Sequence, residues 1–123
     1  MQEQISKHIA SHSKWKQRLK SAIETGQSEW DVAGVRPDNL CDFGKWLHTM
    51  STAMKSNEHY KEVLQFHAEF HNVAATVLEL ALAGKKAEAE KALEFGGTFA
   101  TASVKLTQAM MNWKRSLGDA KAA

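Results

Sequence analysis

The segment Asn57–Gly84, NEHYKEVLQFHAEFHNVAATVLELALAG, decides the fold class of this chain. Apolar residues and histidines recur along it at steps of three and four, which places them on one face of a helix. That face comprises Tyr60, Val63, Leu64, His67, Phe70, His71, Ala74, Val77, Leu78 and Ala81. Ser56 or Asn57 is suited to cap the start of the helix, and Gly84 is suited to end it. We therefore predict a long amphipathic helix that buries one face.

Two more long helices are predicted from the same periodicity. One covers residues 2–25 and ends at Gly26, and the other covers residues 85–117. The inward-facing residues should be Ile5, His8 or Ile9, His12, Trp15, Leu19 and Ala22 or Ile23 in the former, and Ala92, Phe99, Ala102, Leu106, Met110 and Trp113 in the latter. Gly96 and Gly97 weaken the later helix by about 1 kcal/mol per glycine relative to Ala, and they mark either a kink or a close helix approach.

A shorter helix that carries the only cysteine is predicted between these two. Pro37 fits a first helical turn, so the helix should begin there, after a loop at 26–39 with room for a helical turn near Trp30. One face would hold Leu40, Phe43, Leu47, Met50 and Met54. Cys41 would then lie within or just after the first turn.

The four helices and their short connections predict an all-α protein. The expected architecture is an antiparallel four-helix bundle with one shorter helix carrying the cysteine. A chain of 123 residues is long enough for one domain with a real core but hardly for two. We therefore expect a single domain over 1–123, with 118–123 as a frayed tail.

Charge and hydropathy narrow the functional classes. Sixteen basic and fourteen acidic residues are interleaved and give a net charge of +2, with no basic stripe of the kind that binds nucleic acid. The longest apolar-rich stretch, VAATVLELALAG at 73–84, is shorter than the roughly 20 residues that span a bilayer. The N-terminus is polar and unlike a signal peptide. We expect a cytoplasmic protein that neither inserts into a membrane nor binds nucleic acid.

Histidines within the apolar stripes are the candidate metal ligands. His67 and His71 stand four residues apart, so both project from one helix face, although HxxxH alone is a weak signal. His12 also replaces an apolar residue in a stripe, and a buried neutral histidine without partners costs on the order of 1–3 kcal/mol. Three histidines and Cys41 around one ion would satisfy all four, and this set suits zinc, while copper and iron also accept these ligand types. His8 is a rival to His12 that spacing alone does not exclude.

The stretch around the cysteine is consistent with such a site. A position near a helix N-terminus favours the thiolate of Cys41, the form that binds metal. Gly44 has no side chain and would let a neighbouring helix come close. The side chains of Phe43, Trp46 and Leu47 should pack around the site, and they are equally expected as plain core residues.

Three motifs together resemble the chemoreceptor zinc-binding (CZB) domain family of bacteria. They are HSKWKQRL (His12–Leu19), LCDFGKWL (Leu40–Leu47) and HAEFHNVAATVLELALAGKKAEAEKAL (His67–Leu93). The family pattern is HxxW, then CxFGxW, then HxxxH, and no motif position departs from it here. The zinc ligands implied by the resemblance are His12, Cys41, His67 and His71. The HxxW context selects His12 over His8.

The resemblance also implies a biological role. Family members sit in cytoplasmic chemoreceptors and diguanylate cyclases, where zinc binding regulates output, and some resemble sensors of hypochlorous acid. The family fold is a four-helix bundle that commonly forms homodimers. We expect this chain to be either a free-standing member or a regulatory domain, with a signalling output domain in the same or a partner chain.

Three other functions compete with a sensory domain. A structural zinc scaffold for protein interactions would use the same ligands without sensing. A thiol enzyme with Cys41 as nucleophile is disfavoured because no oxyanion site or substrate pocket is indicated. An oxygen-carrying di-iron bundle would want more histidines and bridging carboxylates in the stripes. We therefore expect no enzymatic activity and no catalytic residues.

Overall fold

The computed structural model describes the backbone of residues 2–122 and the side chains of residues 2–117, and all regular structure in that part of the chain is helical. The helices are α1 (Gln2–Ser13), α2 (Trp15–Thr25), α3 (Val32–Val35), α4 (Asp42–His48), α5 (Thr52–Lys55), α6 (Glu58–Leu82), α7 (Lys86–Leu93) and α8 (Thr98–Ala122). The expected all-α class is confirmed. The tail at 118–123 lies outside the residues whose side chains are described.

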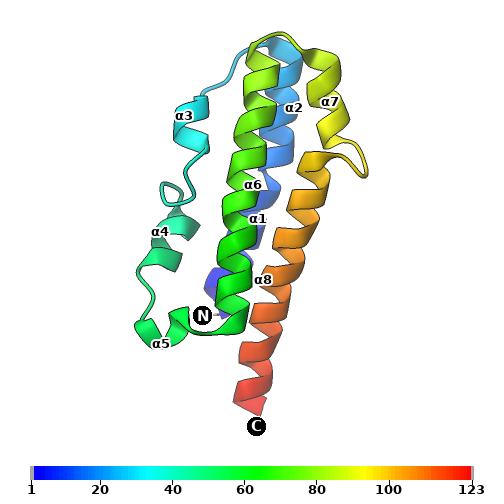
Figure 1. The fold of residues 1–123 in the computed structure, drawn as a ribbon. Coiled ribbons are helices and arrows are strands. Elements are labelled where there is room, and N and C mark those ends of the chain that lie inside the picture. The colour runs from blue at the N-terminus through cyan, green and yellow to red at the C-terminus, as the bar shows by residue number, and fades with distance from the viewer. Residues whose placement is uncertain (1, 123) are drawn as a thin grey trace.

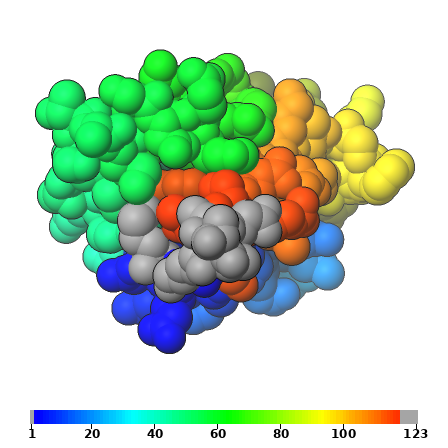
Figure 2. Space-filling view, turned by 90° about the horizontal axis from the view of Figure 1, so that it is seen from below, coloured from blue at the N-terminus to red at the C-terminus, as the bar shows by residue number. Residues whose placement is uncertain are grey.

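The helices form columns that alternate in direction (Figure 1). The α1–α2 column runs away from the chain's N-terminal end, the short helices α3, α4 and α5 return along one side, α6 runs back beside them, and α7 and α8 descend again. Helices α6 and α8 share the most extensive interface, and α6 also contacts α2 and α3. Seen from below in Figure 2, the start of α1, the α5–α6 region and the later part of α8 meet at this end.

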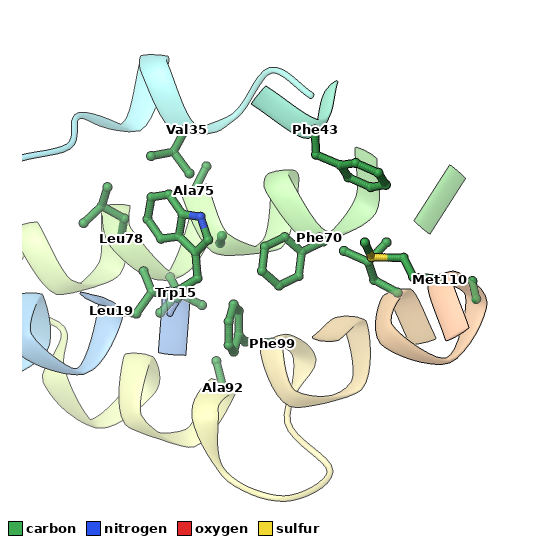
Figure 3. Close-up of a cluster of buried hydrophobic side chains, with 14 of the residues drawn as sticks. Trp15, Leu19, Val35, Phe43, Phe70, Ala75, Leu78, Ala92, Phe99 and Met110 are labelled. Atoms are coloured by element: carbon green, nitrogen blue, oxygen red, sulfur yellow. The ribbon is translucent and has the colours of Figure 1, made fainter. Parts of the chain in front are cut away.

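The core lies between α6, the α1–α2 column and α8. Figure 3 shows its central side chains, among them Trp15, Leu19, Phe70, Leu78 and Phe99. Every residue of the predicted α6 face is buried except Leu64, which is half-buried. The inward residues predicted for the last helix are also buried. For these two segments the periodicity therefore predicted the buried faces correctly, although it missed the break between α7 and α8.

The helix expected at 2–25 is interrupted at Lys14. The backbone N–H of Lys14 donates to the Ser11 carbonyl over 3.3 Å, which is an i→i−3 bond, and the Ser13 hydroxyl donates to the Ala10 carbonyl over 2.7 Å. Serine hydroxyls compete for helical carbonyls in this way. Beyond this turn α2 ends as expected at Gly26, whose φ of 72° is left-handed and whose N–H donates to the Ala22 carbonyl.

The helix predicted to begin at Pro37 and to continue through Met54 is wrong in extent. Pro37 lies in the loop, and α4 begins at Asp42 with Cys41 as its N-cap. Leu40, expected on the buried face, has 52% of its surface exposed. After α4 the chain restarts as α5, because the Ser51 hydroxyl caps a new turn by accepting from the Met54 N–H.

The helix predicted over 85–117 is two helices, α7 and α8. Gly96 sits between them with φ of 83°, a left-handed conformation in which glycine carries no steric penalty. At Gly97 a Cβ would overlap the carbonyl oxygens of Lys91 and Ala92. The close approach anticipated at this glycine pair is therefore to the end of α7. No helix among the described residues is long and apolar enough to cross a bilayer.

Candidate metal centre

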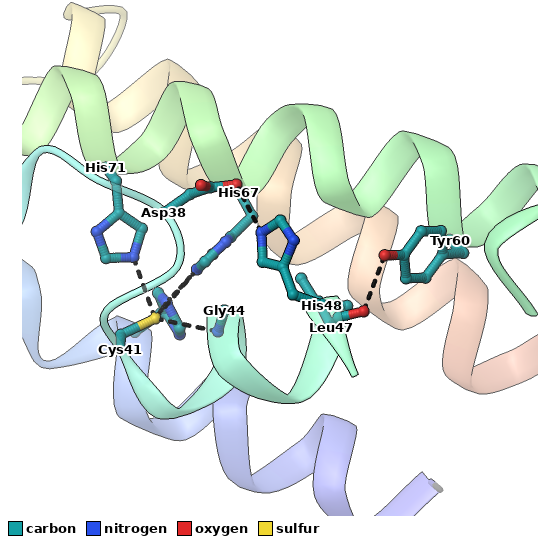
Figure 4. A network of polar contacts seen from close by, with 9 residues as sticks. Asp38, Cys41, Gly44, Leu47, His48, Tyr60, His67 and His71 are labelled. Carbon is teal, nitrogen blue, oxygen red and sulfur yellow. Dashed lines mark hydrogen bonds and ion pairs between the residues drawn. The ribbon is translucent and has the colours of Figure 1, made fainter. Parts of the chain in front are cut away.

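Three separate segments bring four side chains to one point beside α6. His12 comes from the last turn of α1, Cys41 precedes α4, and His67 and His71 lie one turn apart on α6. One nitrogen from each histidine and the cysteine sulfur all lie within 4.8 Å of one another. Figure 4 shows Cys41 facing the His67 and His71 rings. The structure thus assembles all four residues predicted from the sequence.

The separations between donor atoms suit a tetrahedral ion. The Cys41 Sγ lies 3.3 Å from His67 Nε2, 3.4 Å from His71 Nε2 and 3.9 Å from His12 Nε2. The Nε2 atoms of His67 and His12 lie 3.2 Å apart. Tetrahedral zinc with ordinary bond lengths would place nitrogens about 3.3 Å apart and sulfur about 3.6 Å from nitrogen. The residues present therefore fit zinc by donor type and by spacing.

Hydrogen bonds on the far side of two rings aim their nitrogens at this point. His12 Nδ1 donates to the His8 carbonyl over 2.8 Å, and His71 Nδ1 donates to the Val35 carbonyl over 2.9 Å. With Nδ1 protonated in a neutral ring, Nε2 presents a lone pair. Two such lone pairs and a sulfur converge on one space, and a cation placed there is attracted to all of them.

Burial keeps the histidines neutral, which is the form that binds metal. Desolvation and, less strongly, the neighbouring histidines lower the pKa of His12 to about 4, against the hydrogen bond to the His8 carbonyl, which raises it. The same two causes lower the pKa of His67 to about 2. Desolvation also lowers the pKa of His71, against the Val35 hydrogen bond, which raises it. All three rings are therefore ready to act as ligands at neutral pH.

Opposing effects act on the thiol pKa of Cys41. Burial raises its thiol pKa, and this outweighs the hydrogen bonds from the Gly44 and Phe43 N–H groups, which lower it. The N–H groups at the helix start do favour the thiolate, as expected from the sequence. Burial has the larger effect, however, so in the metal-free site the pKa of the thiol is raised and not lowered. A bound cation would have to supply the stabilisation that deprotonates the thiol.

Gly44 has a different partner from the one expected. A Cβ at Gly44 would overlap the carbonyl of Asp38 and crowd Asn39, so the glycine makes room for the turn that precedes Cys41 and not for a neighbouring helix. The same residue's N–H donates to the Cys41 sulfur over 3.3 Å. Gly44 therefore allows the Asp38–Asn39 backbone to pack closely against α4, and its N–H donates to the residue that caps this helix.

Aromatic rings pack against the histidines of the cluster. Phe43 lies 5.0 Å from the His67 ring centroid and 5.6 Å from that of His12, both edge-on, and Phe70 packs against His12 at 5.4 Å. Phe43 and His67 are almost fully buried, with 1% and 0% exposed. The expected packing of Phe43 around the site is confirmed, and it forms an apolar wall against His12 and His67.

The family model for the chemoreceptor zinc-binding domain matches residues 12–78. The chain belongs to the CZB family. The match begins at His12 and includes Cys41, His67 and His71, so it covers the whole cluster. No curated protein and no solved structure matched the chain.

Within this CZB site, His8 has a supporting place. Its side chain lies outside the four-residue cluster and stacks on Phe43 at 4.8 Å and Trp46 at 5.8 Å, while its carbonyl orients His12. His48 is exposed, and its Nε2 lies 3.6 Å from Asp38 Oδ2. The structure thus separates His12 from His8, which spacing alone left open.

A cleft of about 320 Å³ connects this CZB site to solvent. It is lined by Cys41, His12 and His71, and also by Arg18 and Trp30. The Arg18 guanidinium lies 4.9 Å from the Trp15 ring centroid and 4.5 Å from that of Trp30. The loop after α2 therefore lines the same cleft as three of the candidate ligands.

Proposed function

We propose that this chain is a bacterial cytoplasmic regulatory domain that binds zinc through His12, Cys41, His67 and His71. The observation that carries the proposal is the convergence of these donor atoms within 4.8 Å in a member of the CZB family. Because four protein ligands complete a tetrahedral shell, no position is left for a reactive water. The role is therefore regulatory and not enzymatic.

The chain's own residues divide the work of such a site. The carbonyls of His8 and Val35 hold the His12 and His71 rings, and Phe43 packs edge-on against His12. Zinc, when bound, would keep Cys41 as a thiolate. Since Cys41 caps α4 and the two other segments are long helices, the short α3–α5 side is the part whose position depends most on this bond.

Two stimuli fit the site: the zinc level itself and oxidation of Cys41. The cleft exposes the sulfur to a small oxidant. A thiolate and hypochlorous acid give sulfenic acid and chloride, the sulfur being oxidised and the chlorine reduced. Sulfenic acid is a poorer ligand, so α4 would be released. We propose that this change controls chemotaxis or cyclic-di-GMP signalling through an output domain in the same or a partner chain, within a homodimer.

The alternative is a structural zinc scaffold without sensing. The deep burial of the histidines favours it, since His67 is 0% exposed and His71 is 3% exposed. A permanent ion would tie the three segments together and leave the outer helix faces to bind a partner. In that case Cys41 would resist oxidation while zinc is bound.

Native mass spectrometry tests the proposal. Protein purified without added metal should carry one zinc per chain, and a few equivalents of hypochlorous acid should remove zinc as Cys41 gains oxygen. Zinc that stays bound to reduced Cys41 would support zinc sensing or the scaffold instead. Folded protein that takes up no zinc, even when zinc is added, would overturn the ligand assignment.

A further inference from the structure

Arg36 joins the short helix α3 to two residues of α6 that follow the candidate zinc ligand His71 along that helix. Its Nη1 donates to Asn72 Oδ1 over 2.6 Å, and its Nη2 donates to Glu79 Oε2 over 3.2 Å. Asn72 follows His71 directly in the chain, and Glu79 lies two turns further along α6. A planar guanidinium that binds two partners fixes direction as well as distance.

Arg36 is also the C-cap of α3, next to the carbonyl that orients His71. The Val35 side chain is buried against α6, with 3% exposed, and its carbonyl accepts from His71 Nδ1 over 2.9 Å. At the other end of α3, Asp31 caps the helix by accepting from the Gly34 N–H. The position of the Val35 carbonyl is therefore set by a four-residue helix that Arg36 fastens to α6.

The three candidate histidines differ in which group, if any, orients the ring through a hydrogen bond to Nδ1. His12 is oriented by a carbonyl one turn back in its own helix, so its orientation needs no distant residue. His67 Nδ1 is buried with no hydrogen-bond partner among the described residues. Only His71 is oriented by a group that reaches it from another segment.

We propose that Arg36 is a positioning residue for the metal site, acting through the Val35 carbonyl on the orientation of His71. This inference rests on the zinc-binding function proposed above. Outer-shell partners of ligating histidines typically change metal affinity by 10–100-fold. Because Arg36 acts one step removed, we expect a loss of about fivefold in zinc affinity when its side chain can no longer bind Asn72 and Glu79.

The test compares Arg36→Met with Lys61→Met. Lys61 pairs with Glu58 on the same helix at 3.9 Å, and it is more exposed than Arg36, so its loss controls for removing a surface ion pair from α6. Zinc affinity is measured by competition with a chelating dye. In parallel, NMR measures solvent exchange of the Hδ1 protons of His71 and His12 in the zinc-loaded protein. Arg36→Met should weaken zinc binding about fivefold and speed exchange at His71 only, and Arg36→Lys should restore part of both.

Two results would overturn the inference. One is unchanged zinc affinity in Arg36→Met. The other is faster exchange at His12 and His71 alike, which would indicate general loosening. If Arg36→Met fails to fold, Glu79→Gln removes the charge of one partner and must give the same His71-specific effect. If the wild type binds no zinc, the proposed function fails, and the Hδ1 comparison in metal-free protein still decides the role of Arg36.

Discussion

At the scale of single residues, Cys41 has two separable roles. Its sulfur caps α4 by accepting from the Gly44 N–H and faces three imidazole nitrogens. Serine is a better N-cap than cysteine but does not supply a thiolate. Cys41→Ser should therefore keep α4 and lower zinc affinity more than about 100-fold, beyond the usual effect of outer-shell changes.

Competition with a chelating dye measures that affinity, and circular dichroism checks the helices. Cys41→Ala provides the comparison, because it removes the cap as well as the ligand and should be less stable than Cys41→Ser by about 1 kcal/mol. Zinc binding by Cys41→Ser within a few-fold of the wild type would show that the sulfur is not a ligand.

The buried histidines also predict how the metal-free protein responds to acid. His12 and His67 titrate near 6.5 when unfolded, but burial lowers their folded pKa to about 4 and about 2. Below pH 6.5 these two histidines bind protons in the unfolded chain but stay neutral in the folded one. Stability therefore falls as the pH drops towards the folded pKa values. Between pH 7 and pH 5 the loss should be on the order of 2 kcal/mol for each of these histidines.

Urea unfolding in the presence of a chelator measures this slope. His67→Gln removes one of the two groups and should make the dependence shallower, while His59→Gln, a histidine outside the cluster, should leave it unchanged. Equal stability at pH 7 and pH 5 would contradict the burial of neutral histidines in the metal-free fold.

At the scale of elements, Gly44 determines how α4 meets the chain before it. An alanine there would overlap the Asp38 carbonyl, and backbone cannot yield as easily as a side chain. Gly44→Ala should therefore destabilise the fold by about 1–3 kcal/mol and weaken zinc binding, because the cap of α4 carries the ligand sulfur.

Gly34→Ala is the comparison variant, because it also lies in a short helix but its new Cβ would meet a side chain, the Asp31 carboxylate, and not backbone. That carboxylate caps α3, so Gly34→Ala should cost some stability, but less than Gly44→Ala. Thermal unfolding and dye competition on both variants give the comparison. A Gly44→Ala protein as stable and as zinc-competent as the wild type would mean that the Asp38 turn moves freely.

The same elements show what the sequence could and could not predict. Buried faces and the four clustered side chains were predictable, because helical periodicity and histidines in apolar stripes depend only on the identity of the side chains, which the sequence gives directly. The limits of the short helices were not. Met50 and Met54 continue the spacing of Phe43 and Leu47, so the break before α5 left no mark in the hydrophobic pattern.

The backbone groups around the site were even harder to predict from the sequence. Val35 orients His71 through its carbonyl, and Asp38 shapes the site through a backbone turn. Every residue carries a carbonyl, so nothing in the sequence distinguishes the one that a folded loop brings to a histidine. The family motif was informative because it includes Gly44, whose missing side chain records that backbone contact.

At the scale of the whole molecule, the candidate ligands link α1, the segment before α4, and α6. A ligand that binds only the folded state stabilises it, by about 2.7 kcal/mol at a concentration 100 times its dissociation constant. That gain should not be spread evenly. Helices α6 and α8 already share the most extensive interface and carry much of the core, so they are held without metal.

The α3–α5 side has far less support of its own. Its helices are four, seven and four residues long, and isolated helices of such length are not stable in water. We therefore expect hydrogen exchange in residues 31–56 to slow by at least tenfold on zinc binding, while the middle of α6 and α8 changes little. Mass-spectrometric exchange with and without chelator measures both regions in one experiment. Cys41→Ser should abolish the difference, and equal protection across all helices would show that zinc stabilises the fold globally and does not act on this side in particular.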